Sequence, residues 1–298
     1  MATVAELITY PVKGCAGTSV NSTRLTPAGL AHDRAFMVVG VDGVYRSQRR
    51  DPRLALVRPT VSADGGTLTL APAAEPPGEA YAGARGEAYG EVRVAVTTSA
   101  PRREVDLFGT AYQGIDQGDE AAAWLSDFLG VPSRLVRVPP EHDRKTDGVT
   151  PGTSGYADSS AVHLLTRASY ALLGTRLAER GAGPLPLDRF RPNIVVDSAP
   201  GEAGAEDWAA APHAEDRVRR ATVGSAELGY AKLAVRCAVT LVDQEAGARG
   251  GPEPLRTLAT YRRAPFGVVF GAKFSVTRPG EVSVGDEVAV AEWGDPEV

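Results

Sequence analysis

Short β-branched runs and alternating apolar positions dominate residues 1–95, and they predict strands joined by turns. Asp42-Gly43 and Asp64-Gly65-Gly66 are typical of tight turns between paired strands. Residues 71–90 are rich in Ala, Pro, Gly and Glu and show no apolar period, so a loop is expected there. The expected strands span residues 4–10, 35–41, 54–61, 67–70 and 92–97.

The rest of the chain mixes helical periods with further strands. Residues 118–129 and 166–180 each carry an apolar stripe at helical spacing, and a third, shorter helix is expected over 253–262. Strands outnumber helices and no βαβ rhythm is visible, so the pattern predicts a strand-dominated mixed α/β fold, a β-barrel with helices attached. The expected strands span residues 134–138, 162–165, 193–196, 226–242, 270–276 and 287–290.

Composition limits the classes of protein that fit. A chain of 298 residues with 43% hydrophobic content can form one large or two medium domains. No apolar run approaches the ~18 residues of a membrane span, and residues 1–6 lack the start of a secretion signal, so we expect a soluble, cytoplasmic protein without a membrane partner. A net charge of −5 argues against a nucleic-acid partner. Two distant cysteines do not form a disulfide framework.

Cys237 is the first candidate for chemistry. It lies within residues 232–243, an alternating and β-branched run that predicts a strand or a strand pair. Arg236 precedes it and would favour the thiolate if the two groups converge, and a thiolate binds soft metals or attacks electrophiles. The alternative is a small apolar residue buried in a strand.

Three further segments carry polar groups at the ends of expected strands. Arg189-Phe190-Arg191-Pro192-Asn193 offers guanidinium and amide groups suited to a phosphate or a polar heterocycle. Lys13-Gly14 and Asp33-Arg34 adjoin other strands, and Lys13 beside free backbone amides resembles a phosphate site without a Walker motif. Asp158-Ser159-Ser160 could hold a ligand or cap a turn. Taken separately, each segment also fits an ordinary surface ion pair or turn.

The order and spacing of several motifs resemble one family. The chain resembles the MOSC proteins, named for the C-terminal domain of molybdenum cofactor sulfurase, and in particular the branch of the mitochondrial amidoxime reducing component and its bacterial relatives. The motifs are Tyr10-Pro11-Val12-Lys13-Gly14-Cys15, Asp33-Arg34-Ala35-Phe36-Met37, Asp51-Pro52-Arg53-Leu54, Phe190-Arg191-Pro192-Asn193, Arg236-Cys237-Ala238-Val239-Thr240-Leu241-Val242-Asp243, Glu253-Pro254-Leu255-Arg256 and Val284-Gly285-Asp286-Glu287-Val288.

The resemblance implies two domains and a bound cofactor. An N-terminal MOSC-type β-rich domain would cover residues 1–98, and a MOSC β-barrel domain would cover 99–298, with the molybdenum cofactor (Mo-molybdopterin) between them. Cys237 matches the cysteine that ligates molybdenum, and Asp158 is the candidate for a nearby proton donor or hydrogen-bond partner. The residues expected to bind the cofactor are Lys13, Gly14, Arg34, Ser159, Ser160, Arg191 and Asn193, with Arg236 added because it adjoins the thiol.

The function that the resemblance implies is reduction of N-hydroxylated substrates, namely amidoximes, hydroxylamines or hydroxamic acids, by oxygen-atom transfer to molybdenum. The chain has no four-cysteine iron–sulfur motif, so electrons are expected from a separate protein such as a ferredoxin, a cytochrome b5-like protein or a flavin reductase. A monomer is expected. The alternative is a carrier that holds a persulfide on Cys237 or passes the whole molybdenum cofactor to another enzyme.

Overall fold

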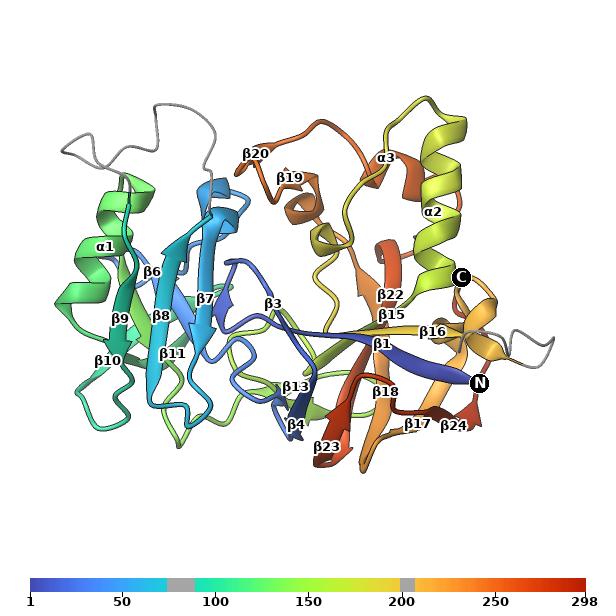
Figure 1. Ribbon diagram of the computed structural model, residues 1–298, viewed down its shortest axis with the longest axis horizontal. Coiled ribbons are helices and arrows are strands. Elements are labelled where there is room, and N and C mark those ends of the chain that lie inside the picture. The colour runs from blue at the N-terminus through green and yellow to red at the C-terminus, as the bar shows by residue number, and fades with distance from the viewer. Residues whose placement is uncertain (74–88, 199–206) are drawn as a thin grey trace.

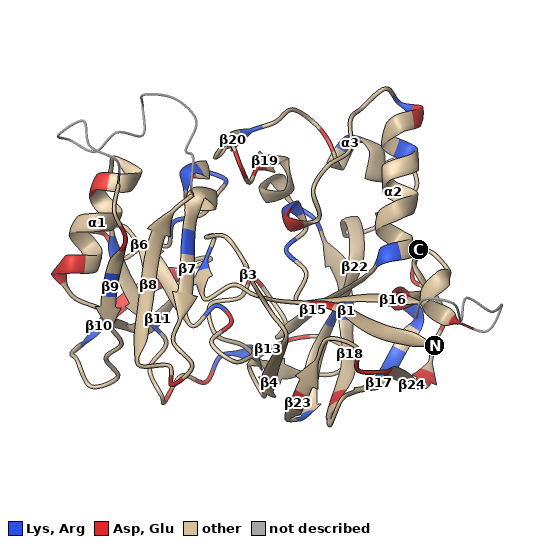
Figure 2. Ribbon diagram, viewed as in Figure 1, with Lys and Arg blue, Asp and Glu red and all other residues tan. Residues whose placement is uncertain are grey.

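The structure is a computed structural model that describes residues 1–73, 89–198 and 207–298, and it is strand-dominated mixed α/β, as predicted. Its elements form two halves, with most of the first 137 residues on one side and the rest on the other (Figure 1). Basic and acidic residues are interspersed over both halves (Figure 2). The predicted loop at 71–90 lies mostly outside the described residues.

The first half contains two small sheets covered by one helix. Helix α1 (Asp119–Leu129) buries Ala121, Leu125 and Phe128 against the sheets, and it ends at Gly130, whose φ of 71° suits glycine. The strands are β10 (Arg102–Leu107), β11 (Thr110–Asp116), β12 (Arg134–Arg137), β6 (Phe36–Val39) and β2 (Val12–Lys13) in one sheet, and β7 (Val57–Val61), β8 (Thr67–Pro72) and β9 (Val92–Ala95) in the other.

The predicted domain boundary at residue 98 stays a prediction. Strands β10, β11 and β12 follow that residue in the sequence, and they pair in one sheet with β6 and β2, which precede it.

A nine-stranded sheet forms the second half. Val4 of β1 exchanges backbone hydrogen bonds with the turn at Gly285 and Asp286 that leads into β24, so the sheet curls back on itself. Along the sheet lie β24 (Val288–Trp293), β17 (Val218–Val223), β18 (Ala226–Val235), β22 (Gly267–Arg278), β15 (Val162–Thr166), β16 (Ile194–Ser198), β1 (Ala2–Thr9) and β3 (Thr18–Val20), and β21 (Arg263–Ala264) pairs with β22.

The second half contains a βαβ unit, which the sequence pattern did not predict. Strands β15 and β16 pair in parallel, and α2 (Arg167–Glu179) connects them. The hydroxyl of Thr166 accepts a hydrogen bond from the Ser169 backbone and caps the helix. The predicted helix at 253–262 is shorter than expected, because α3 spans only Leu255–Leu258.

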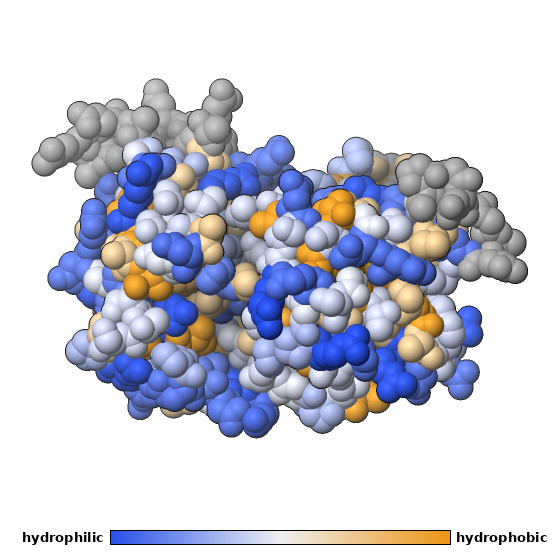
Figure 3. All heavy atoms as spheres, turned by 60° about the horizontal axis from the view of Figure 1, so that its bottom comes forward, coloured by the Kyte–Doolittle hydropathy of each residue, from blue (hydrophilic) through white to orange (hydrophobic). Residues whose placement is uncertain are grey.

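Short strands and turns complete the described chain. No helix among the described residues is both long and apolar enough to cross a membrane. On the face shown in Figure 3, hydrophilic side chains predominate and hydrophobic ones form small, separate groups. The short elements are β4 (Ser22–Thr26), β5 (Gly29–Leu30), β23 (Gly280–Ser283), β13 (Lys145–Thr146), β14 (Gly152–Thr153), β19 (Val242–Asp243), β20 (Ala248–Arg249) and the 3-10 turns Pro52–Leu56, Leu187–Arg189, Trp208–Ala210, Ala214–Arg217 and Ala238–Leu241.

Candidate functional site

A cavity of about 290 Å³ lies where the two halves meet. Segments far apart in the sequence form its wall: the end of β2, the turn at residue 34, residues 45–49, the loop 157–160, residues 190–193, the end of β18 and the middle of β22. The structure brings all ten sequence-predicted site residues to this one cavity, although their roles stay predictions. They are Lys13, Gly14, Arg34, Asp158, Ser159, Ser160, Arg191, Asn193, Arg236 and Cys237.

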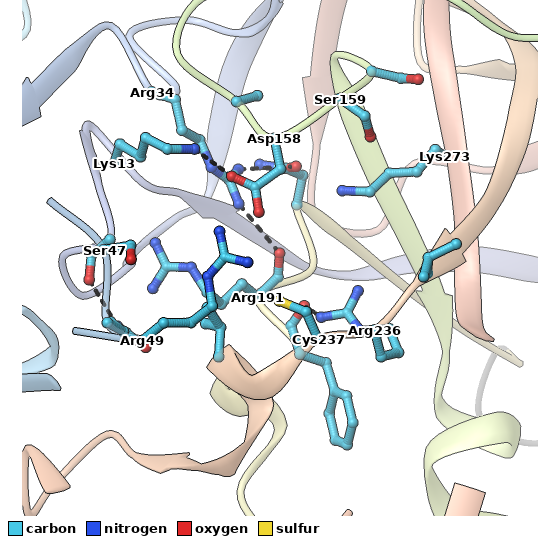
Figure 4. A pocket seen from close by; sticks show the side chains of 18 of the residues that line it. Lys13, Arg34, Ser47, Arg49, Asp158, Ser159, Arg191, Arg236, Cys237 and Lys273 are labelled. Atoms are coloured by element: carbon cyan, nitrogen blue, oxygen red, sulfur yellow. Dashed lines mark hydrogen bonds and ion pairs between the residues drawn. The ribbon is translucent and has the colours of Figure 1, made fainter. Parts of the chain in front are cut away.

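Cys237 lies at a turn and not within a strand, so the predicted strand at 226–242 is wrong over residues 236–241. Strand β18 ends there, and the chain enters a 3-10 turn in which the Cys237 carbonyl accepts hydrogen bonds from the backbone and hydroxyl of Thr240 at 3.0 and 2.9 Å. The bend turns the half-buried thiol toward the cavity, beside Arg236 and Arg191 (Figure 4). The alternative of a cysteine packed within a strand therefore does not fit.

Lys13 and Asp158 join the two halves across the cavity through a short ion pair. The Lys13 side chain is only 6% exposed, whereas that of Asp158 is 63% exposed toward the open space. Burial alone would raise the pKa of Asp158, but the Lys13 ammonium outweighs burial, and the pKa lies well below its usual value. An ionised Asp158 is a hydrogen-bond acceptor and counter-ion, and its low pKa disfavours proton donation near neutral pH.

Arg34 is held by a buried network. Its guanidinium donates to Asp33 Oδ2 at 2.6 Å and to Asn193 Oδ1 at 3.1 Å. The Asn193 amide in turn donates to Asp33 Oδ1 at 3.0 Å, so the three side chains fix one another. The Arg34 backbone adopts a left-handed φ of 47°, and its carbonyl accepts from the Tyr156 backbone at 2.9 Å. A Cβ at Gly155 would lie 2.8 Å from that carbonyl, so this close approach requires glycine.

Arg191 reaches the cavity from the other half of the molecule. Its guanidinium carbon and that of Arg34 both lie 4.2 Å from the centre of the Tyr10 ring, and its backbone also has a left-handed φ, of 54°. Burial and the nearby Arg34 lower the pKa of Arg191. Its Nη2 atom is buried without a hydrogen-bond partner among the described residues. A non-glycine residue in this conformation, with an unsatisfied cation, is typical of a binding site.

Two more residues of the cavity lining carry a buried polar atom with no partner in the described part of the chain: Nε of Arg236 and Oγ of Ser160. Nη2 of Arg236 donates to the Phe190 carbonyl at 2.8 Å, which fixes the guanidinium. Burial lowers the pKa of Arg236 to about 10, so the side chain remains a cation at neutral pH. Gly14 also lines the cavity, and its φ of 81° is a backbone conformation that favours glycine.

The charges that line the cavity fit an anionic cofactor with a soft metal. Seven lining residues are cations and only Asp158 is an acid. The unpartnered donors of Arg191, Arg236 and Ser160 are suited to phosphate oxygens and polar heterocycles. Cys237 adds the one thiol, a ligand suited to soft metals. The residues present therefore fit a molybdenum cofactor. The cations are Lys13, Arg34, Arg49, Arg191, Lys232, Arg236 and Lys273.

Sequence reasoning missed several residues of the site. Arg144 donates to the carbonyls of Gly155 and Ala157 at 3.0 and 2.5 Å and thereby holds the loop that carries Asp158. Lys273 lies in the apolar run 270–276, where a lone lysine among buried positions is a signal that could have identified it. No pattern marks Arg49 among the neighbouring arginines.

Two family models match the chain. The MOSC N-terminal beta barrel domain matches residues 1–132, and the MOSC domain matches residues 151–289. Every sequence-predicted site residue lies within one of these ranges, with Lys13, Gly14 and Arg34 in the first.

Curated relatives match nearly the whole chain. Mitochondrial amidoxime-reducing component 1 of Mus musculus is 32% identical over 96% of this chain and 81% of its own length, and mitochondrial amidoxime reducing component 2 of Rattus norvegicus is 32% identical over 96% and 82%. Molybdenum cofactor sulfurase of Danio rerio is 31% identical over 89% of this chain but only 31% of its own length. The chain belongs to the MOSC family, with a MOSC N-terminal beta barrel followed by a MOSC domain, and it is a distant homologue of the mitochondrial amidoxime-reducing components.

Proposed function

We propose that the protein is a molybdenum-cofactor oxidoreductase that reduces N-hydroxylated compounds such as amidoximes, hydroxylamines or hydroxamic acids. One observation carries the proposal: a thiol and seven cations line a single cavity in a homologue of the amidoxime-reducing components. A cavity of this composition suits an anionic cofactor whose metal takes a soft sulfur ligand.

Different residues of the cavity would bind different parts of the cofactor. Arg191 would bind the phosphate from one half, and Lys13 and Arg34 would bind the cofactor from the other. The Asn193 amide is fully hydrogen-bonded within the protein, so it would position Arg34 and would not contact the pterin through its side chain. Cys237 would hold the metal through its sulfur, and Arg236 would lie beside that sulfur as a fixed positive charge. When bound, the cofactor supplies the two-electron chemistry that breaks a nitrogen–oxygen bond.

The polar residues around the thiol would place the substrate. The ionised Asp158 keeps the Lys13 ammonium in position and offers a carboxylate acceptor to an N–H or O–H group of the substrate. Reduction of an N–OH group to N–H consumes two electrons and two protons and releases water. The electrons would come from a separate donor protein, of which a ferredoxin, a cytochrome b5-like protein and a flavin reductase are the candidates.

Benzamidoxime reduction with a chemical reductant tests the proposal. Protein purified with its molybdenum quantified should convert benzamidoxime to benzamidine, and a Cys237→Ala variant should not. Molybdenum-loaded protein without turnover of amidoximes, hydroxylamines or hydroxamic acids would overturn the proposed activity. The relationship to molybdenum cofactor sulfurase gives a carrier of sulfur or cofactor as the second candidate, and a persulfide on Cys237 of metal-free protein, detected by mass spectrometry, would favour it.

A further inference from the structure

Lys273 is a cation of the cavity that makes no direct ion pair with any described residue, and Asp158 and Asp33 act on it only at longer range. It is a half-buried residue of β22, and its ammonium forms no hydrogen bond or ion pair with any described residue. Lys13, in contrast, pairs with Asp158, and Arg34 pairs with Asp33. An ammonium drawn partly out of water without a partner is unfavourable, and a bound anion would remove that cost.

The position of Lys273 keeps it facing the cavity. Strand β22 pairs on both sides, with His163 of β15 and Lys232 of β18 directly opposite Lys273, so the backbone cannot turn the residue away. Figure 4 shows its ammonium entering the cavity from a different wall than the thiol of Cys237.

The residues expected to bind the cofactor do not include Lys273. The resemblance to the family accounts for the cations at Lys13, Arg34 and Arg191, and adjacency to the thiol accounts for Arg236. Lys232 pairs with Asp147, and Arg49 donates to the Tyr45 hydroxyl at 3.0 Å. Lys273 therefore remains, among the described residues, as a cavity cation with neither an assigned role nor a direct partner, in the space where a substrate must approach Cys237.

We propose that the substrate of this cavity carries a carboxylate and that Lys273 binds it, an inference that rests on the proposed reductase function. A hydrogen-bonded ammonium–carboxylate pair in a partly buried site is stronger than a neutral hydrogen bond. A neutral substrate would leave the ammonium unpaired, so Lys273 would select acidic N-hydroxylated compounds over neutral ones.

The charges around Lys273 give this selection a pH dependence. Burial, with Arg34 and Arg236 acting in the same direction, lowers the pKa of Lys273 to about 7, and Asp158 and Asp33 oppose the shift. The ammonium binds a carboxylate and the neutral amine does not, so the preference for acidic ligands should weaken as the pH rises from 7 to 9. The neighbouring strands contribute the buried His163 and the rim residue Lys232, which pairs with Asp147.

The test compares neutral and carboxylated ligands. We expect molybdenum-loaded protein to reduce 3- or 4-carboxybenzamidoxime with a kcat/KM at least about tenfold above that of benzamidoxime at pH 6.5. Lys273→Met should lose most of that ratio, whereas Lys145→Met, a matched change at an exposed lysine, should keep it. Equal or lower kcat/KM for both acids, or an unchanged ratio in Lys273→Met, would overturn the inference.

Binding measurements separate this inference from the proposed activity. Calorimetry should give tighter binding of 3- or 4-carboxybenzamidine than of benzamidine, with the difference lost in Lys273→Met, even if no amidoxime is reduced. Equal affinities would contradict the inference whatever the activity. Molybdenum content that falls in Lys273→Met while Lys145→Met stays loaded would assign Lys273 to the cofactor instead and would also overturn it.

Discussion

The Lys13 ammonium from the first half of the chain pairs with the Asp158 carboxylate from the second, and this ion pair lies in the wall of the same cavity as the thiol of Cys237. Nζ of Lys13 also lies 4.8 Å from the centre of the Phe108 ring, so the ammonium contacts both a carboxylate and an aromatic ring. Burial lowers the pKa of Lys13 despite its partner, which makes the ammonium dependent on Asp158.

Removal of Asp158 should therefore destabilise the protein. In Asp158→Asn, the buried Lys13 loses its counter-ion, and we expect the free energy of unfolding at pH 7 to fall by about 1–3 kcal/mol. Because the folded-state pKa of Asp158 is depressed, its contribution is present above pH ~4 and lost as the pH falls further. Urea unfolding at pH 7 and pH 3 measures both effects. An Asp158→Asn variant as stable as the wild type at pH 7 would contradict this role.

Arg191 should lower the free energy of unfolding of the cofactor-free protein, although it favours binding of the cofactor. Its buried guanidinium has an unpartnered nitrogen and lies near the cation of Arg34. Arg191→Met should raise the free energy of unfolding of cofactor-free protein by about 1 kcal/mol and lower the molybdenum content of purified protein severalfold. The exposed Arg24→Met is the control and should change neither quantity. A destabilised, fully loaded Arg191→Met variant would oppose the prediction.

Glu215 should make stability fall as the pH rises. It is fully buried and accepts hydrogen bonds from Thr166 and Ser169 at 2.9 and 2.8 Å. Burial, with help from the neighbouring Asp216 carboxylate, raises its pKa to about 7. The folded state therefore binds more protons than the unfolded state between pH ~4.5 and 7, so this group's stabilisation is lost as the pH rises through that window.

A Glu215→Gln variant isolates this contribution. The amide oxygen can keep both hydrogen bonds, and no charge needs to be buried, so we expect the variant to be more stable than the wild type by about 1–3 kcal/mol at pH 8 and by little at pH 4.5. The buried histidines His163 and His213 shift stability in the opposite direction in both proteins, so the difference between the two unfolding curves is the quantity to measure. A difference that is constant with pH would count against the prediction.

The sequence identified the residues of the cavity better than the path of the chain around them. Side-chain chemistry at strand ends and the resemblance to a family were sufficient to select Lys13, Arg34, Arg191 and Cys237. The apolar alternation of residues 226–242 could not show that β18 ends at Val235, because the turn depends on local hydrogen bonds to the Cys237 carbonyl. Alternation predicts strand character, but it does not show where a strand loses its partner.

The βαβ unit and Lys273 were missed for different reasons. A glycine- and proline-containing connection separates α2 from β16, so the helix and the second strand are not adjacent in the pattern. Their parallel pairing depends on tertiary contacts. Lys273 stands alone in an apolar strand, and one lysine cannot be assigned to a cavity until the neighbouring strands are placed.

Molybdenum content in cysteine variants tests the central claim most directly. Cys237 lines the cavity, whereas the chain's other cysteine, Cys15, is fully buried in the core, so Cys15→Ala is a matched control. Elemental analysis of purified protein should find close to one molybdenum per chain in the wild type and in Cys15→Ala, and little in Cys237→Ala. A Cys237→Ala variant that retains the wild-type molybdenum content would contradict the account.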